Sequence, residues 1–589
     1  MNTITIPQLK PIFPAVRHRD YREVVDEAAR TYKNEDAFII KTRRETKSRP
    51  AAYRHVSFQD FREDVYALGT GLIAAGLSGK RTAVLADNCY EWILTMMTVL
   101  SGTGIFVPLD KGLPQEEILS SIERAGCQVL IFDKKHRQAA SQLAGQLEES
   151  GRGGLALVSM DDLPEGLCLP SLMKMGREAL DAGDTRFRDT EIDPDAVHLF
   201  IFTSGTTSRA KAVMLTETNV LNNVYIMEET QDIRHGDINM AFLPLHHTFA
   251  SGTQVLMISS GVTTVFCDGL RYIQKNMVEY GVTIFVGVPL LIEAIWKKIM
   301  QGIHKQGKEK AFQRGLRLSA FLRRLGIDRR RAIFKDIHAQ LGGRLRYVFS
   351  GASALDAAVA DGFEAIGICV VEGYGMTEAS PVICTQDDRH RRPGTVGMAL
   401  PSVELELRDV NENGIGEIYA RSPSIMKGYY EDPEETAACL SEDGWLRTGD
   451  LGRMDEDGYL CLTGRSKNVI VLKNGKNVYP EELEALLTPL PGVKENVVLG
   501  VVRHEGGDPR DLAILAKVVY DPDIMRDRFG CETEDQVQAH FQAEIDRINE
   551  ELPAYKQIQR LHVQQKELIK TTTGKVKRFE EGAVQSFRK

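Results

Sequence analysis

The stretch Phe200–Thr216, FIFTSGTTSRAKAVMLT, joins an apolar run to a loop that is rich in hydroxyl groups. The run Ala196–Phe202 is short and contains Val, Ile and Phe, so it predicts a buried strand. The loop adds serines, threonines and the cations Arg209 and Lys211. Hydroxyls and backbone N–H groups donate to phosphate oxygens, and cations offset phosphate charge. The loop therefore predicts a polyphosphate site, with a solvated Ser/Thr turn as the ordinary alternative.

The pattern around this strand predicts an α/β fold. From about Ser57 to Phe266, helical patterns alternate with short apolar runs such as TAVLA and VLIF, and further runs follow up to Gly375. This alternation predicts doubly wound parallel sheets, whose ligands bind beyond the carboxyl ends of the strands. After Pro393 the pattern changes to antiparallel strands joined by NENG and DEDG turns, and a small α+β unit begins near Ser466.

Composition limits the class of protein. With 589 residues the chain is too long for one hydrophobic core, and its net charge of −9 argues against a nucleic-acid partner. The nine cysteines form no C-x-x-C pair, so we expect reduced thiols in a cytoplasmic protein. The N-terminus has no apolar core, and the uncharged stretches 92–109 and 241–267 contain turn or polar residues. Neither a signal peptide nor a membrane span is expected.

Several common nucleotide and catalytic motifs are missing from the sequence. A Walker A motif needs two glycines at fixed spacing before its lysine, whereas only Gly205 precedes Lys211 in this loop. No G-x-G-x-x-G follows a predicted strand, and neither H-E-x-x-H nor G-x-S-x-G occurs. These absences argue against P-loop NTPases, Rossmann dehydrogenases, zincins and α/β-hydrolases.

The hydroxyl loop resembles the phosphate loop of adenylate-forming enzymes, the acyl-CoA synthetase or AMP-binding superfamily, which usually reads Y/F-T-S-G-T-T-G-x-P-K-G-V. The resemblance spans roughly residues 82–578 and is greatest to long-chain fatty acid–CoA ligases. The order of the motifs is more specific than any one of them. The further motifs, in the family's order, are LPLHHTF (243–249), GYGMTEAS (373–380), RPGTVGMALPSVELEL (392–407), GEIYARSPSIMKGYY (416–430), WLRTGDLG (445–452), GRSKNVIVLKNGKNVYPEELE (464–484) and TTTGKVKR (571–578).

The resemblance implies an ATP- and Mg²⁺-dependent reaction in two steps. A carboxylate attacks the α-phosphorus of ATP to give an acyl-adenylate and pyrophosphate, and the thiol of coenzyme A then displaces AMP. The carboxylate is already ionised at neutral pH, so the protein has to hold two anions together and neutralise charge rather than supply a general base. The implied fold has an N-terminal domain, residues 1–465, with doubly wound sheets, a distorted antiparallel β-barrel and both the ATP and acyl sites. Residues 466–589 would form a small mobile α+β domain with a hinge near Lys467.

The resemblance also implies a role for each matched residue. Glu378 is expected to be the Mg²⁺ carboxylate, Tyr374 to lie against adenine, and Asp450 and Arg465 to hold the ribose. In isolation these residue types are also common in helix starts, packing and turns. The implied phosphate contacts are Thr203, Ser204, Thr206, Thr207 and Lys211, of which Thr206 is also expected to be catalytic. Further implied nucleotide contacts are Gly351, Ala352, Gly375 and Thr377.

Two more catalytic roles are implied, for Lys575 and His247. Lys575 is expected to bridge the carboxylate and the α-phosphate during adenylation and then to move away with its domain, whereas a solvated basic tail is the plain alternative. His247 matches the family histidine beside the acyl site, and a core histidine is its alternative. The loop departs from the family pattern at Ser208, Ala210 and Ala212, and Ile569 replaces a frequent proline, which predicts a changed turnover rate.

The substrate and partners are predicted less directly. No acidic residue follows LPLHHTF, which disfavours an α-amino acid, and apolar residues near the predicted acyl site suit a fatty acid, with an aryl acid as the alternative. The acceptor is expected to be CoA or an acyl carrier protein, and a non-catalytic nucleotide-binding scaffold is the rival from another class. Segment 297–346 carries fifteen Lys and Arg against three acidic residues. It predicts peripheral contact with the inner face of a membrane, or else a solvated basic face.

Overall fold

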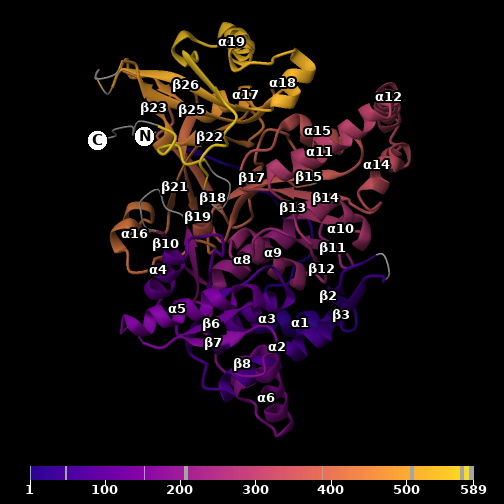
Figure 1. Cartoon of the computed structure of the whole chain (residues 1–589), viewed down its shortest axis with the longest axis vertical. Coiled ribbons are helices and arrows are strands. Elements are labelled where there is room, and N and C mark those ends of the chain that lie inside the picture. The colour runs from indigo at the N-terminus through magenta and orange to yellow at the C-terminus, as the bar shows by residue number, and fades with distance from the viewer. Residues whose placement is uncertain are drawn as a thin grey trace.

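The computed structural model describes residues 2–46, 49–151, 153–203, 210–387, 389–504, 508, 510–570 and 576–582. In Figure 1 two α/β layers occupy the lower and middle parts of the molecule, and a smaller unit with yellow and orange ribbons lies at the top. The predicted α/β class is confirmed. None of the helices in these ranges combines the length and the apolar composition that a bilayer crossing needs.

An eight-stranded sheet carries the strand that the opening stretch predicts. Its inner strands are parallel, while β10 pairs antiparallel with β9 and β20 pairs antiparallel with β10. The buried apolar run is β9, as expected, and it ends where the hydroxyl loop begins. In order, the strands are β20 (Gly428–Tyr429), β10 (Lys211–Thr216), β9 (Val197–Thr203), β5 (Gly104–Pro108), β4 (Lys80–Leu85), β6 (Val129–Phe132), β7 (Ala156–Ser159) and β8 (Leu167–Cys168).

A nine-stranded sheet forms the second layer. It is parallel from β15 to β2 and antiparallel at both ends. In order, the strands are β17 (Met398–Ala399), β16 (Val382–Thr385), β15 (Cys369–Gly375), β14 (Tyr347–Ser350), β13 (Ile284–Gly287), β11 (Ile238–Ala241), β12 (Thr263–Phe266), β2 (Asp36–Arg43) and β3 (Ala52–Ser57). One group of helices packs against this sheet and shares a hydrophobic cluster with it: α10 (Ile273–Tyr280), α11 (Pro289–Lys305), α12 (Glu309–Arg324), α13 (Arg330–Ile333), α14 (Lys335–Gln340) and α15 (Ala357–Ala365).

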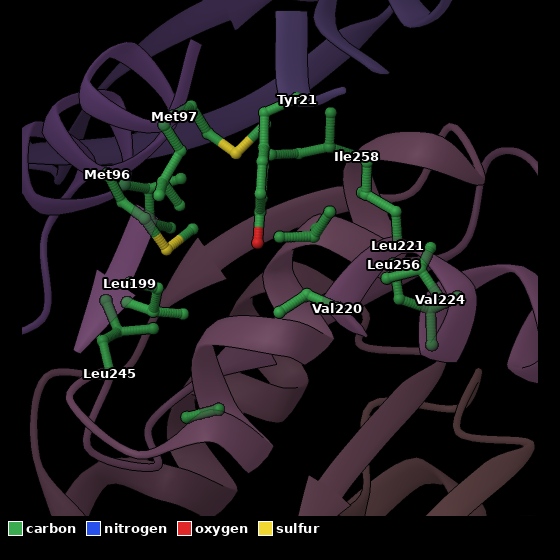
Figure 2. Packing of buried hydrophobic residues seen from close by; sticks show 14 of the residues in the cluster. Tyr21, Met96, Met97, Leu199, Val220, Leu221, Val224, Leu245, Leu256 and Ile258 are labelled. Carbon is green, nitrogen blue, oxygen red and sulfur yellow. The ribbon is translucent and has the colours of Figure 1, made fainter. Parts of the chain in front are cut away.

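The main hydrophobic core lies where helices from both layers meet. Figure 2 shows side chains from α1, α3, β9, α8 and α9 pointing toward one another, including Tyr21, Met96 and Leu256. Burial of each such side chain contributes about 1.5–3 kcal/mol, which fixes the two sheets relative to each other. The helices around this core are α1 (Tyr21–Tyr32), α2 (Phe58–Ala74), α3 (Tyr90–Thr98), α6 (Leu169–Asp181), α7 (Arg186–Asp189), α8 (Glu217–Thr230) and α9 (Thr248–Ser259). Helices α4 (Gln115–Ala125) and α5 (Arg137–Glu149) supply a separate cluster of the eight-stranded sheet.

Helix α8 shows how the sequence sets an element next to the predicted site. It starts directly after β10 with a reciprocal cap, in which Thr216 accepts from the Asn219 backbone N–H at 3.1 Å and Asn219 accepts from the Thr216 N–H at 3.0 Å. The Asn219 amide also donates to the Pro423 and Ile425 carbonyls at 2.7 and 2.8 Å. One buried asparagine therefore caps the helix and fixes the segment that leads to β20.

The antiparallel strands form an open sheet instead of the expected barrel. In order, they are β1 (Ile4–Thr5), β18 (Glu404–Arg408), β19 (Ile415–Arg421), β21 (Leu446–Met454) and β22 (Leu460–Arg465). Among the described residues the edge strands β1 and β22 do not pair with each other. Strand β1 has only two residues and pairs with β18, and β22 pairs with β21. The nine-residue strand β21 was not anticipated, since its TGDLG stretch resembles a turn.

A smaller α+β unit follows β22. Its sheet contains β25 (Val493–Val502) antiparallel to β26 (Leu512–Tyr520), with β27 (Arg560–Gln564) parallel to β26. A short hairpin, β23 (Ile470–Val471) and β24 (Asn477–Val478), precedes it. Its helices are α17 (Pro480–Leu487), α18 (Pro522–Phe529) and α19 (Glu534–Glu551). Buried residues such as Val498 and Ile545 give the unit hydrophobic clusters of its own.

Candidate active site

The predicted phosphate loop lies between β9 and β10. The register of the two strands pairs Thr203 with Lys211, and the Thr203 hydroxyl donates to the Lys211 carbonyl at 3.5 Å. These two residues therefore lie side by side at the ends of the loop. The predicted phosphate contacts Ser204, Thr206 and Thr207, as well as Ser208, lie outside the described residues.

Lys211 reaches toward two residues that the sequence did not single out. Its Nζ lies 2.5 Å from Glu435 Oε2 on α16 (Pro433–Cys439) and 4.7 Å from the centre of the Tyr429 ring. A cation over an aromatic face is attracted by the ring's negative face. Lys211 is thus held between a carboxylate and a ring, close to the loop that it follows.

Glu378 lies at the hydroxyl end of the same tyrosine. It belongs to the short 3₁₀ turn Thr377–Ala379 after β15, and only 9% of it is exposed. The Tyr429 hydroxyl donates to Glu378 Oε1 at 2.8 Å, and the Glu378 carbonyl accepts from the Met426 N–H at 2.9 Å. Thr377 contacts the Thr248 hydroxyl of α9 at 3.4 Å. Tyr429 therefore connects the predicted phosphate lysine with the predicted metal carboxylate.

These residues fit the requirements of a magnesium ion that arrives with a nucleotide. Within the part of the chain that the structure describes, no group of three or more His, Cys, Asp or Glu side chains could hold a metal by itself. Magnesium commonly takes one or two protein carboxylates and completes its octahedron with phosphate oxygens and water. The single buried carboxylate of Glu378 is a hard oxygen donor of this kind.

Gly375 explains why the turn after β15 is so tight. A Cβ atom at this position would lie 1.8 Å from the Pro381 carbonyl oxygen, so no other residue fits. The backbone of residue 375 pairs with Val382 across this approach. The sequence GYGMTEAS therefore turns back on itself, and the turn points Glu378 toward β20.

Tyr374, Asp450 and Arg465 form a second cluster beside the first. The Tyr374 hydroxyl donates to Asp450 Oδ2 at 2.8 Å, and Arg465 Nε donates to Asp450 Oδ1 at 2.8 Å. Asp450 and Arg465 face each other across β21 and β22, whereas Tyr374 comes from β15. One aspartate thus joins the nine-stranded sheet to the antiparallel sheet.

Burial and charge set the protonation of this cluster. Burial, together with the Asp450 carboxylate, raises the pKa of Tyr374 well above its ordinary value, so its hydroxyl remains a donor. Burial opposes the charge of Arg465, but Asp450 and the more distant Glu378 carboxylate raise the pKa of its guanidinium. Tyr374 lies in β15 and Glu378 in the turn that follows it, so the two clusters meet at the end of β15.

The remaining predicted residues described by the structure lie after β14 and at the start of α9. Gly351 and Ala352 follow the strand, and Ala352 has a φ of 75°, a left-handed conformation that is uncommon for a residue with a side chain. A Cβ on Gly351 would lie 3.0 Å from the Phe249 ring. His247 caps the N-terminus of α9, and its ring lies 4.1 Å from that of His246, whose Nε2 is 3.5 Å from Asp110.

A small apolar cavity of about 40 Å³ adjoins this region. It lies between α8, α9 and the ends of β13 and β14, and it reaches Ser380, two residues after Glu378. The Ser380 hydroxyl is buried without a hydrogen-bond partner among the described residues. The apolar lining of the cavity consists of Val224, Met227, Phe249, Leu256, Met257, Val286, Phe349, Pro381 and Val382. Val224 and Leu256 appear in Figure 2 on facing helices.

Lys575 and the four residues before it lie outside the described residues. The chain after it is anchored, because Arg578 donates to both oxygens of Glu484 at 2.7 Å and to the Val498 carbonyl at 2.9 Å. Tyr429, Glu435 and Arg578 were not predicted as functional residues. All three lie within quoted motifs or next to one, but a tyrosine after a glycine or an arginine in a basic tail carries no specific signal alone.

Comparison with known proteins agrees with this arrangement. Residues 25–430 match the model of the family described as AMP-binding enzyme. The peroxisomal long chain acyl-CoA synthetase 7 of Arabidopsis thaliana is 30% identical over 513 residues, which cover 81% of this chain and 70% of that protein. Long-chain-fatty-acid–CoA ligase 6 of Homo sapiens is 30% identical over 501 residues, covering 80% of this chain and 70% of the ligase.

Solved structures share the fold at lower sequence identity. The anthranilate CoA ligase AuaEII, in complex with anthranoyl-AMP, superposes with a TM-score of 0.73 at 20% identity over 97% of each chain. ATP-bound MatB from Rhodopseudomonas palustris gives a TM-score of 0.70 at 22% identity over 95% of this chain and 98% of its own. Because the family model spans well over half of the sequence and relatives match most of its length at 30% identity, the chain belongs to the family of AMP-binding enzymes.

Proposed function

We propose that the protein is an ATP- and Mg²⁺-dependent acid–thiol ligase that activates a fatty acid as its acyl-adenylate and transfers the acyl group to CoA. The observation that carries this proposal is the convergence of two clusters, Lys211–Tyr429–Glu378 and Tyr374–Asp450–Arg465, beside an apolar cavity. The relatives named as long-chain fatty acid ligases support the same substrate class.

Each cluster has a distinct task in the proposed reaction. Lys211 and the hydroxyl loop would hold phosphate oxygens, and a magnesium ion at Glu378 would supply positive charge to them. Asp450 would accept hydrogen bonds from the ribose hydroxyls, and Arg465 would keep that carboxylate oriented. Such positioning and charge neutralisation are the main contributions that a protein makes to nucleotidyl transfer.

The relatives named as long-chain fatty acid ligases favour an alkyl chain over an aromatic acid. The small cavity has an apolar lining that includes Phe249 and Met257 of α9, about two turns of the helix apart, which suits contact with an apolar acyl group. The structural likeness to an anthranilate CoA ligase gives the aryl alternative little support, because at 20% identity it shows a shared fold and not a shared substrate. His247, at the start of α9, would lie at the carboxyl end of such a chain.

The proposal is tested by AMP release across saturated fatty acids of graded length and a benzoate, with and without CoA. Fatty acids should release AMP and form a thioester with CoA, with the rate rising to an optimum of chain length. Preference for benzoates would favour the aryl ligase, and adenylation that only an acyl carrier protein discharges would favour the other alternative. No acid-dependent turnover of ATP would favour the scaffold.

We also propose peripheral contact between helix α12 and an anionic membrane surface. Phe312 and Ser319 bury one side of α12, while Leu318, Phe321 and the C-cap residue Leu325 are at least half exposed. The same outward side carries exposed cations at positions 310, 314, 317 and 324. In Figure 1 α12 lies at the upper right margin of the molecule. Apolar side chains framed by cations are typical of helices that lie in an anionic lipid interface.

Vesicle sedimentation tests this contact. Vesicles of phosphatidylcholine with phosphatidylglycerol should bind the protein, and vesicles of phosphatidylcholine alone should not. Arg314→Glu with Arg317→Glu should reduce binding at least several-fold, and Phe321→Ser should reduce it as well. The matched control is Lys174→Glu on α6, another exposed cation. Equal binding by all variants would contradict the proposal.

A further inference from the structure

Tyr429 contacts both the predicted phosphate residue Lys211 and the predicted metal residue Glu378. Its hydroxyl donates to Glu378 Oε1 at 2.8 Å, and its ring faces Lys211 Nζ at 4.7 Å. Only 7% of its surface is exposed. The side chain therefore contacts the carboxylate through its hydroxyl and the ammonium group through its ring.

The backbone around Tyr429 is fixed from several sides. Strand β20 pairs antiparallel with β10, with Tyr429 opposite Val213, and the Tyr429 N–H donates to the Thr436 hydroxyl at 2.9 Å. Gly428 has a φ of 134°, and a Cβ there would lie 2.7 Å from the Thr436 methyl group. Strand pairing, a hydrogen bond to helix α16 and a glycine that a side chain would strain thus determine where the tyrosine points.

The Tyr429 hydroxyl acts as a hydrogen-bond donor to Glu378 in this site. A carboxylate oxygen accepts hydrogen bonds, so the phenolic hydroxyl that lies 2.8 Å from Glu378 Oε1 is the donor of this pair. This bond engages Oε1, and no hydrogen bond from the described residues reaches Oε2, which leaves Oε2 for another ligand. Met426 holds the Glu378 backbone at the same time, so the glutamate is restrained at both ends.

We propose that Tyr429 is a positioning residue, whose hydroxyl orients the Glu378 carboxylate toward the metal–nucleotide complex and whose ring keeps Lys211 directed at the phosphates. This inference rests on the proposed role of Glu378 as the magnesium carboxylate. Hydrogen-bond partners of metal ligands fix ligand orientation, and their loss typically lowers metal affinity about 10- to 100-fold.

The test is the affinity for Mn²⁺, as a spectroscopic substitute for Mg²⁺, measured by electron paramagnetic resonance with ATP present. Tyr429→Phe removes the hydroxyl and keeps the ring, so the Mn²⁺ dissociation constant should rise about 10-fold or more. The melting temperature should change by no more than a few degrees. The KM for ATP should rise, while the KM for the acid should stay close to that of the wild type.

The adjacent tyrosine supplies a matched control. The Tyr430 hydroxyl accepts from Arg81 at 2.9 Å, so Tyr430→Phe also removes one hydrogen-bonded phenol but should leave Mn²⁺ affinity unchanged. Glu378→Gln should weaken Mn²⁺ binding at least as strongly as Tyr429→Phe.

The outcomes separate the inference from the proposed function. If Glu378→Gln weakens Mn²⁺ binding while Tyr429→Phe behaves like Tyr430→Phe, the positioning role is overturned and the metal site stands. If Glu378→Gln leaves Mn²⁺ affinity unchanged, the assignment of the metal carboxylate is wrong, and the positioning role falls with it. If Tyr429→Phe and Tyr430→Phe weaken binding equally, the effect is structural and the inference is also overturned.

Discussion

Glu372 is a buried carboxyl group beside the site, and its burial changes its protonation. It lies two residues before Tyr374, is 4% exposed, and receives the Leu355 N–H at 3.3 Å, while its Oε1 has no hydrogen-bond partner among the described residues. Burial raises the pKa of Glu372 to about 7. The folded protein therefore binds a proton here at a pH at which the unfolded chain has lost it.

This shift predicts a pH-dependent stability. Below the unfolded pKa of 4.5 the raised pKa of Glu372 does not lower the free energy of unfolding. As the pH rises from there toward 7, the free energy of unfolding falls, by about 3 kcal/mol or less in total. Glu372→Gln avoids the cost, so it should raise the melting temperature at pH 8 and not at pH 4.5. Glu412→Gln, at an exposed position, is the control. The same difference at both pH values would contradict the assignment.

At the scale of elements, α17 connects the end of the chain to the predicted hinge. Arg578 bonds to Glu484 and, at 3.3 Å, to Glu481, and the Glu481 carboxylate accepts from Asn468 at 2.7 Å. Glu481 also lies so close to Gly464 on β22 that a Cβ there would be 2.4 Å from its Oε2. Asn468 follows Lys467, so one carboxylate touches both sides of the hinge.

We therefore expect Glu481→Gln to change the balance between the two half-reactions. If this contact favours one orientation of residues 466–589, its loss should slow one half-reaction and accelerate the other, so that the ratio of their rates changes at least about 3-fold, or roughly 0.7 kcal/mol. The neighbouring Glu482→Gln should leave this ratio unchanged, because Glu482 pairs with Lys556 at 2.6 Å and both residues belong to the same unit. Rapid-quench measurements of both steps decide this, and a parallel loss of both would indicate simple destabilisation.

The elements also show what sequence could and could not predict. Strongly apolar runs such as β9 and β15 were predicted, because composition alone marks a buried strand. Strand β20 was missed because it is short and pairs with β10, far earlier in the chain. Strand β21 was missed because its TGDLG stretch resembles a turn, although its partners β19 and β22 lie nearby in the sequence. The expected barrel is an open sheet. Whether a sheet closes depends on whether its two edge strands pair with each other, and local sequence does not show this. Motif resemblance named Glu378 and Asp450, but the role of Tyr429 needed the three-dimensional contact.

At the scale of the whole molecule, the proposed cycle requires residues 466–589 to move relative to 1–465. Lys575, which the resemblance assigns to adenylation, lies outside the described residues, so its role stays a prediction. Lys575→Ala should abolish formation of the acyl-adenylate, yet a supplied acyl-adenylate should still react with CoA, because the lysine is needed only at the α-phosphate. Thioester formation from synthetic acyl-adenylate, measured by chromatography, checks this. Equal loss of both steps would contradict a moving lysine.

The central claim is that residues from two sheets hold one triphosphate so that an organic acid joins its α-phosphorus. The most direct measurement is exchange of labelled pyrophosphate into ATP, with a fatty acid present and CoA absent. The account predicts exchange that requires the acid and that falls at least about 10-fold in Asp450→Asn, which weakens the contact to Arg465. Exchange that is absent with every acid tested, or that proceeds equally without acid, would contradict it.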